Sequence, residues 1–239
     1  PPGDVEARIH CLRLGADECI PFDSAEEETL ARIEALLRIK SIQDRMERSR
    51  RELQRLSTVD GLTGLSSRRH LQARCREELV RARRYRDPLS LILVDVDHFR
   101  EVTGRLGEAA GDAVLCEVAR RLRGVLREVD LAGRQGGDTF VVVLPSTHIT
   151  GALAVAERIW KAIGERPFLV AGERLTVRVS LGLSFFPARG VSSHEDLFRL
   201  AQDALHRAKR EGRGRICLFQ AAHYFYQPLS PGGASGGGS

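Results

Sequence analysis

The stretch from Ser24 to Asp60 contains neither glycine nor proline, and this constrains the fold more than any other feature of the chain. Ser24 and Glu27 have the spacing of a capping box, which satisfies the first free N–H groups of a helix. Steps of three and four residues then alternate, as in the seam of a coiled coil. An amphipathic helix packed on its own domain is the alternative, but the dense charge beside the seam favours a coiled coil. We therefore expect residues 24–57 to form a linker helix that pairs two copies of the chain through Ile39, Ile42, Met46, Ser49, Leu53 and Leu56.

Residues 58–220 alternate between helical and strand patterns, and we expect them to form the folded domain. The order β-α-β-β-α-β predicts an α+β fold with an antiparallel, ferredoxin-like sheet flanked by helices. Residues 221–239 end in a run of glycine and serine, which predicts a flexible tail or linker. The expected helices cover 68–84, 99–125 with a glycine break, 149–163 and 193–211, and the expected strands cover 89–94, 131–134, 140–144, a hairpin at 168–186 around Gly172, and 215–219.

Composition excludes several classes of protein. No apolar run approaches the roughly 18–20 residues of a membrane span, and no signal peptide follows Pro1, so we expect neither a membrane partner nor secretion. The five cysteines contain no C-x-x-C pair, which argues against a zinc site and a disulfide framework and favours a reducing cytoplasm. The net charge of +5 comes almost entirely from arginine, but with 5% aromatic residues the chain has few stacking platforms, and we expect no nucleic-acid partner.

Three carboxylates stand at places where a metal ion can bind. Asp95 and Asp97 follow an apolar strand, and we expect strand alternation to leave only one of them facing a given site. Asp138 follows Gly136 and Gly137 in the next hairpin, which lies beside that strand in a β-α-β-β arrangement. Asp95 and Asp138 are therefore candidate ligands for Mg²⁺, and two-metal sites of this kind drive phosphoryl and nucleotidyl transfer. The alternative is an ordinary acid in a turn whose glycines supply positive φ angles.

The segment Arg134-Gln135-Gly136-Gly137-Asp138-Thr139-Phe140 resembles the signature of GGDEF domains, the diguanylate cyclase family. The likeness covers nearly all of residues 58–220 and implies a nucleotidyl-cyclase-like fold. Further segments resemble other motifs of the family in the same order: a motif after the coiled coil at 60–69, a metal strand at 95–99, a guanine-contacting turn at Gly111–Asp112, and a last helix that runs from Ala201 through Lys209 to Arg213.

This resemblance implies a reaction and a set of roles. Members of the family condense two GTP into cyclic di-GMP and pyrophosphate, and they work as dimers because each domain holds one GTP. By resemblance, Asp95, the carbonyl of Val96 and Asp138 are ligands of Mg²⁺. Asp112 accepts from guanine, and the two residues assigned to the phosphates are Lys209 and Arg213.

Four positions around the expected GTP site depart from the family pattern. Thr139 stands where the family has a catalytic glutamate, and a hydroxyl neither carries charge nor acts as a base at neutral pH. Thr103 replaces an asparagine that binds guanine and lacks the paired donor and acceptor of an amide. Arg100 replaces a lysine at another GTP-binding position, and Glu108 replaces a histidine. We therefore expect an impaired or inactive cyclase.

A second site is expected to bind the product of the family. Arg127-Glu128-Val129-Asp130 resembles the inhibitory R-x-x-D site at its usual spacing before the Gly-Gly turn, and Arg158 matches the second arginine of that site. Guanidinium groups pair bidentately with phosphate or with the guanine edge. The alternative is a solvated salt bridge between charges three residues apart. We expect Arg127, Asp130 and Arg158 to bind cyclic di-GMP.

Residues 1–23 contain a further resemblance. Residues 14–22 resemble the end of a response-regulator receiver domain, whose phosphoacceptor aspartate is absent from this chain. We therefore expect the output module of a response regulator controlled by a histidine kinase, which forms homodimers and binds cyclic di-GMP, with GTP a further candidate ligand. Two rival interpretations are an active cyclase with product inhibition and a dimerisation module without a ligand.

Overall fold

A computed structural model of the chain describes residues 5–16, 19–20, 24–219 and 225–226, with side chains at 5–6, 9–16, 19–20, 24–46 and 57–219. The chain divides into two units, residues 1–56 and 57–239. In the described residues, no helix is both long enough and apolar enough to cross a bilayer.

The first unit consists of the helices α1 (Val5–Arg13) and α2 (Glu26–Leu56). The expected long helix is confirmed, but the capping box is wrong: α2 begins at Glu26, and the carbonyl of Ala25 accepts the first helical hydrogen bond, from the N–H of Thr29. Ile39, Ile42 and Met46 of the expected seam are exposed in the single chain. The side chains of Ser49, Leu53 and Leu56, and part of the receiver-like segment 14–22, lie outside the described residues. Pairing through the seam stays a prediction.

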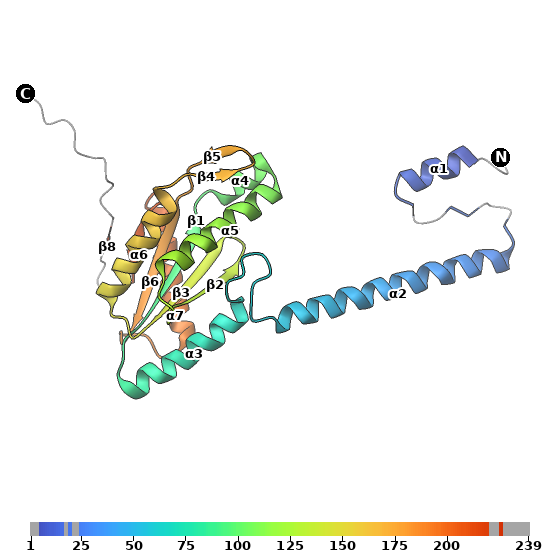
Figure 1. Cartoon of the computed structure of the whole chain (residues 1–239). Coiled ribbons are helices and arrows are strands. Elements are labelled where there is room, and N and C mark those ends of the chain that lie inside the picture. Colours follow the sequence, from blue (N-terminus) through green and yellow to red (C-terminus); the bar gives the residue numbers. More distant parts are fainter. Residues whose placement is uncertain (1–4, 17–18, 21–23, 220–224, 227–239) are drawn as a thin grey trace, which may run out of the picture. The chain divides into compact units, whose positions relative to one another are not determined.

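The second unit is built on a six-stranded sheet with the order β2-β3-β1-β6-β7-β8 (Figure 1). The first four strands in this order pair antiparallel and give the expected ferredoxin-like arrangement. β7 follows a helical crossover and lies parallel to β6, so the whole sheet is mixed rather than antiparallel. Within the expected tail, two described residues pair with β7 as β8. The strands are β1 (Leu89–Val96), β2 (Leu131–Gly136), β3 (Thr139–Pro145), β6 (Val179–Phe186), β7 (Ile216–Leu218) and β8 (Phe225–Tyr226).

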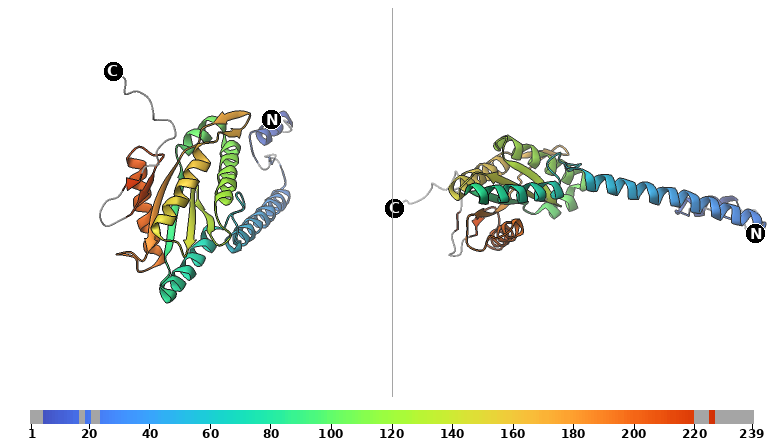
Figure 2. Two further views of the ribbon diagram at one scale, coloured as in Figure 1. Left: turned by 60° about the vertical axis from the view of Figure 1, so that its left-hand side comes forward. Right: turned by 90° about the horizontal axis from the view of Figure 1, so that it is seen from below.

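Helices cover both faces of this sheet, as Figures 1 and 2 show. Alternation along β1 explains the two layers: Leu91 and Leu93 pack with α3 (Arg68–Tyr85) and α7 (His194–Arg210), while Ile92 and Val94 pack with α5 (Glu108–Val125) and α6 (Ile149–Gly164). The short helix α4 (Phe99–Leu106) joins β1 to α5, and Gly107 makes the expected break between the two helices.

The expected hairpin at 168–186 is only partly correct. β4 (Phe168–Val170) and β5 (Glu173–Leu175) form a small separate sheet, and Ala171 and Gly172 have positive φ in its turn. β6 does not extend this hairpin but pairs with β1 in the main sheet. The reason is burial: β6 is buried on both faces over most of its length and belongs in the centre of a covered sheet.

Gly182 allows α7 to pack directly on β6. A Cβ atom at this position would lie 2.2 Å from the carbonyl oxygen of Ala201 and 2.4 Å from the backbone nitrogen of Leu205. Both atoms belong to the backbone of α7, so they cannot move aside as a flexible side chain can. The close approach of the helix therefore requires glycine here.

Arg121 is a charged residue inside the core, with 8% of its surface exposed. Its guanidinium donates to Glu117 and to the carbonyls of Ala162, Ile163, Arg166 and Pro167, and it stacks over the ring of Phe168. The carbonyls at the end of α6 are thereby satisfied. The same pairing lowers the pKa of Glu117 to about 2, chiefly through Arg120 and then Arg121.

Candidate functional site

The centre of the site is a buried carboxylate at the end of β1. Asp95 lies opposite Thr139 in the β1–β3 register, and the hydroxyl of Thr139 donates to Asp95 Oδ2 at 2.9 Å. Lys209 reaches the same carboxylate from α7, with Nζ 2.6 Å from Oδ1. Only 4% of Asp95 is exposed, so the ammonium group offsets the cost of burying its charge. The structure thus brings together three of the expected site residues.

Asp138 is held beside this group by the turn between β2 and β3. Gly136 and Gly137 have φ angles of +141° and +55°. The guanidinium of Arg134 donates twice to the carbonyl of Gly137, at 2.9 and 2.8 Å, and the N–H of Val96 donates to the carbonyl of Asp138 at 3.2 Å. Hydrogen bonds from β2 and from β1 therefore hold the turn, and Val96 lies next to Asp138.

Burial raises the pKa of Asp138, and the charge of Asp95 raises it further, while Lys209 and Arg100 oppose the change. A hard divalent cation would bind between two such carboxylates, because its charge offsets their mutual repulsion. Among the described residues, no group of three or more histidine, cysteine, aspartate or glutamate side chains is placed to hold a metal. Two carboxylates, Asp95 and Asp138, with backbone oxygen at Val96 are nevertheless a donor set that fits Mg²⁺, because this ion takes few protein carboxylates and completes its shell with water and phosphate.

Asp97 has a different role from the one that alternation suggested. Alternation does not separate it from Asp95, because residues two apart lie on the same face of a strand. Asp97 lies beyond the end of β1, where Oδ1 accepts from Ser180 Oγ at 2.7 Å and Oδ2 accepts from the N–H of Gly214 at 3.0 Å. Burial raises its pKa, although these two hydrogen bonds oppose the change. Asp97 therefore anchors the segment after α7.

The only tryptophan of the sequence holds the same segment from the other side. Trp160, on α6, donates from Nε1 to the carbonyl of Gly214 at 2.8 Å. Arg213, the neighbouring residue, has a φ of +60°, and its backbone N–H donates to the carbonyl of Ala208. Arg213 was expected to contact the phosphates. Its side chain is exposed, and the backbone that carries it is held by hydrogen bonds at several points.

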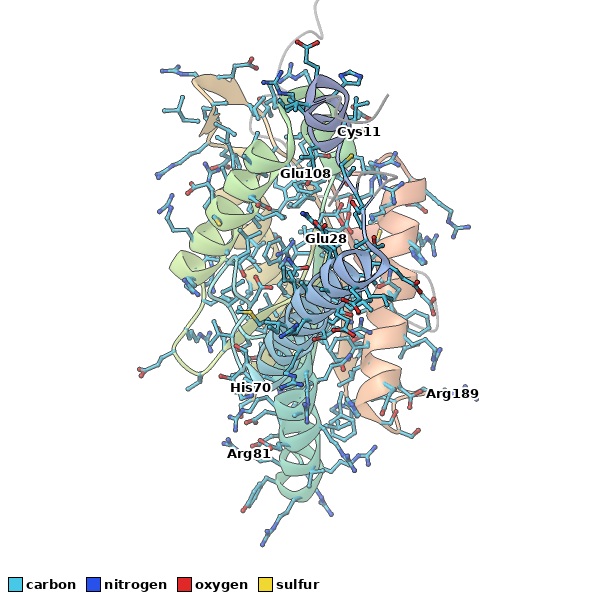
Figure 3. The ribbon with its side chains drawn as sticks, turned by 90° about the vertical axis from the view of Figure 1, so that its right-hand side faces the viewer. Cys11, Glu28, His70, Arg81, Glu108 and Arg189 are labelled. Carbon is cyan, nitrogen blue, oxygen red and sulfur yellow. The ribbon has the colours of Figure 1, made fainter. Side chains whose placement is uncertain are left out.

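The residues expected at guanine lie on α4 and α5. The hydroxyl of Thr103 donates to the carbonyl of Arg100 at 3.1 Å, so its donor is already used within its own helix. Asp112 is exposed on the second turn of α5 and not in a turn between elements, which corrects the expectation. The cause is Gly107, which breaks the helix earlier, so that α5 starts at Glu108, labelled in Figure 3. Gly111 then packs against Thr103.

The R-x-x-D segment forms a closed turn after α5. The N–H of Asp130 donates to the carbonyl of Arg127 at 3.1 Å, and the N–H of Arg127 donates to the Asp130 carboxylate at 2.8 Å. Arg158 reaches the end of α5, where Nη2 donates to the carbonyl of Val125 at 3.3 Å. Arg127 and Asp130 line a hollow of about 350 Å³ together with Arg123 and residues 64–66. Arg158 does not line this hollow.

Sequence reasoning missed several residues that shape these sites. Arg123 carries no motif signal, and its contact with the carbonyl of Thr63 depends on tertiary structure. Asp60 accepts from the N–H and the hydroxyl of Thr63 at 2.9 and 2.7 Å and lies 3.6 Å from Arg134. Burial raises the pKa of Asp60, but these hydrogen bonds and the charge of Arg134 outweigh it and lower the pKa. The sequence indicated Asp60 and Arg134 only as members of the motifs at 60–69 and 134–140, and it did not indicate their contact with each other.

Comparison with known proteins agrees with this geometry. Residues 57–215 match the family model described as diguanylate cyclase, GGDEF domain. A diguanylate cyclase of Vibrio cholerae is 36% identical over 171 residues, which are 72% of this chain and 52% of the relative. The response regulator PleD of Caulobacter vibrioides is 32% identical over 217 residues, 90% of this chain and 48% of PleD. The chain thus spans about half the length of these relatives.

Two solved structures share the fold. The GGDEF domain of PA1120 (TpbB or YfiN) from Pseudomonas aeruginosa has a TM-score of 0.65 and 35% identity, covering 68% of this chain and 94% of that one. The GGDEF domain of DgcB from Caulobacter crescentus, solved in complex with cyclic di-GMP, has a TM-score of 0.64 and 27% identity, covering 68% and 95%.

Proposed function

Since the chain belongs to the GGDEF family of diguanylate cyclases, we propose that it acts in cyclic di-GMP signalling mainly as a receptor. The ligand binds at Arg127, Asp130 and Arg158, and the cyclase activity of the domain is impaired. An active cyclase with product inhibition is the rival, because relatives are named as cyclases.

The observation that supports ligand binding is the ordered R-x-x-D turn beside a hollow. Asp130 already fixes the backbone of Arg127, so little conformational entropy remains to be lost when a ligand binds. The guanidinium groups of Arg127 and Arg123 face one hollow, and no acidic partner of the Arg127 guanidinium is found in the described residues. Such groups bind phosphate and guanine edges bidentately.

Impaired catalysis is supported by the contacts of two threonines. Thr139 offers Asp95 a hydroxyl donor where the family has a carboxylate, which leaves Asp95 and Asp138 as the acidic groups of the metal site. Thr103 spends its hydroxyl on the backbone of α4. Mg²⁺ would bind at Asp95, Val96 and Asp138 and would supply charge stabilisation for the phosphates of GTP. The further contacts of GTP would be Lys209, Arg213, Arg100 and Asp112.

The wider setting of this domain is inferred from its relatives. The match to PleD covers 90% of the chain and therefore includes α2, and it supports a response-regulator output module downstream of a histidine kinase. We infer a homodimer from the seam of α2 and a cytoplasmic location from the five scattered cysteines, which contain no C-x-x-C pair. The domain boundaries proposed from the sequence are 1–23, 24–57, 58–220 and 221–239.

Titration calorimetry with cyclic di-GMP tests the proposal. We expect Arg127→Ala to weaken binding by at least about 2 kcal/mol, because a charge-assisted pair is lost. Arg189→Ala is the matched control, since Arg189 is exposed in the loop before α7 and should leave the affinity unchanged. If the unmodified chain does not bind cyclic di-GMP, the receptor function is wrong. If the Arg127 variant binds with equal affinity, the ligand binds at another site. A separate titration with GTP and Mg²⁺ decides whether the substrate still binds.

A further inference from the structure

The segment after α7 has a backbone conformation that two of its residues adopt easily and a third does not. Gly212, Arg213 and Gly214 have φ angles of +109°, +60° and +58°. Glycine accepts positive φ freely, whereas an arginine in the left-handed region is strained and stays there only when its surroundings hold it. Arg213 is exposed, and among the residues that the structure describes no acidic side chain pairs with it. The segment therefore presents an available guanidinium group on a fixed backbone.

The N–H and the carbonyl of Gly214 are both held by side chains from other elements. The N–H donates to Asp97 Oδ2 at 3.0 Å, and the carbonyl accepts from Trp160 Nε1 at 2.8 Å. Ser180 Oγ donates to the other oxygen of Asp97 at 2.7 Å and so fixes the carboxylate. Only 8% of Asp97 is exposed, so water competes little for its hydrogen bonds. A buried carboxylate thus orients the backbone next to Arg213.

The same contacts tie Arg213 to the carboxylate site. Asp97 follows Asp95 by two residues in the sequence, and Lys209 precedes Arg213 by four. Before Arg213, Lys209 Nζ lies 2.6 Å from Asp95 Oδ1. After Arg213, the N–H of Gly214 bonds to Asp97. The position of Arg213 relative to the end of β1 is therefore fixed at two points.

We propose that Asp97 and Trp160 are positioning residues of the GTP site, which hold the guanidinium of Arg213 where it meets the phosphates of GTP. The inference rests on the part of the proposed function that assigns Arg213 to these phosphates. A guanidinium that is already in place pairs with phosphate oxygens without first losing conformational freedom. When either bond to Gly214 is removed, Arg213 can relax to a negative φ, and its guanidinium leaves that place.

Titration calorimetry of the full chain with GTP and Mg²⁺ tests this role. We expect Asp97→Ala to bind GTP at least about tenfold more weakly, because the guanidinium is no longer held in place. Removing a negative charge near phosphate would by itself strengthen binding, so weaker binding reports a loss of position. Asp97→Asn keeps an oxygen that can accept from Gly214 and should retain more affinity than Asp97→Ala. Trp160→Phe should also weaken binding, because it removes the indole donor and leaves an aromatic ring in the core.

A double-mutant cycle separates positioning from a general loss of structure. Arg213→Gln removes the guanidinium itself and should also weaken GTP binding at least about tenfold. Because Asp97 acts through Arg213, the double variant Asp97→Ala/Arg213→Gln should bind GTP no more weakly than the weaker of the two single variants. A purely structural role of Asp97 would instead multiply the two losses.

Ser90→Ala is the matched control, because it removes a buried hydrogen bond at the other end of β1, from Ser90 Oγ to the carbonyl of Thr147 at 2.8 Å. Its GTP affinity should stay unchanged. Every variant should bind cyclic di-GMP like the unmodified chain, and circular dichroism confirms each fold. If the unmodified chain does not bind GTP, the GTP contact of Arg213 and this inference are both wrong, while the cyclic di-GMP titration tests the receptor function separately. Unchanged GTP affinity of Asp97→Ala, or losses that multiply in the cycle, would overturn this inference alone.

Discussion

The charge balance at Asp95 decides what single residues contribute to the site. Asp95 has one oxygen paired with Lys209 and the other bonded to the hydroxyl of Thr139. A glutamate in place of Thr139 would add a negative charge beside a cation site. With threonine, Lys209 balances much of the negative charge that would otherwise attract metal ions.

Catalysis should therefore be weak. With GTP and Mg²⁺ we expect little or no cyclic di-GMP from the unmodified chain in a chromatographic assay, because metal and guanine contacts that align GTP are lost. Thr139→Glu should raise turnover only partly, since Thr103 and Arg100 remain. Asp138→Ala is the negative control. Robust turnover by the unmodified chain, abolished by Asp138→Ala, would contradict this prediction and show that two acids suffice.

Asp60 should make stability depend on pH. Its pKa is lowered in the folded chain, so its charge stabilises the fold above the ordinary pKa of about 3.9, and this contribution disappears as the pH falls through the lowered value. We expect Asp60→Asn to lower the free energy of unfolding by about 1 kcal/mol at pH 7 and by less at pH 3, measured in urea. Asp44→Asn, at an exposed position of α2, is the control. A difference that is equal or larger at pH 3 would refute the assignment.

At the scale of elements, contacts between backbones matter most. α7 packs on β6 at Gly182, and the same helix supplies Lys209 to Asp95. The placement of Lys209 thus depends on a glycine far from it in the sequence. A change that pushes α7 outward should affect both stability and the site.

We expect Gly182→Ala to destabilise the domain by about 2–4 kcal/mol, because the new methyl group would overlap the backbone of α7. Gly104→Ala is the matched control: nothing lies within 4 Å of its added Cβ, and alanine favours the interior of α4 by about 0.5–1 kcal/mol. Urea unfolding measures both. Equal stability of the Gly182 variant and the unmodified chain would mean that α7 does not pack this closely.

Most elements could be predicted from the sequence, because the periods of apolar residues report which faces are buried. The limits are equally physical. The hairpin at 168–186 was wrong for β6, since a local pattern does not show which distant strand is the partner. In the sequence, Arg121 looks like any surface arginine. Its burial is explained by hydrogen bonds to carbonyls at the end of α6, which only the tertiary structure shows. The signature motif located Asp138 and Thr139, and the motif at 95–99 located Asp95, whereas the anchoring role of Asp97 required the position of Gly214.

At the scale of the whole molecule, assembly is the open property. A coiled coil needs apolar residues on one side of a helix, and the described part of the seam, Ile39, Ile42 and Met46, is exposed in one chain. Ile33 and Leu37 are also exposed, but they lie outside this heptad register. The two stripes therefore offer a direct comparison of variants.

We expect the chain to self-associate in parallel through the seam, with Ser49 a weak point, and sedimentation equilibrium at high micromolar concentration to show a dimer. Ile42→Lys/Met46→Lys should give a monomer, because charge at the seam opposes pairing. Ile33→Lys/Leu37→Lys should remain dimeric. A monomer both with and without cyclic di-GMP would rule out the seam, and a dimer only with the ligand would show that the ligand links the domains.

The hydrogen bond from Trp160 to Gly214 gives the protein an optical property. Because Trp160 is the only indole in the sequence, the whole tryptophan emission comes from one place. The indole lies on α6 and is bonded to the segment that Asp97 anchors and that carries Arg213. A change in wavelength or quenching on addition of a nucleotide therefore reports on the contact between α6 and this segment. The chain needs no attached dye for binding at this segment to be followed in real time.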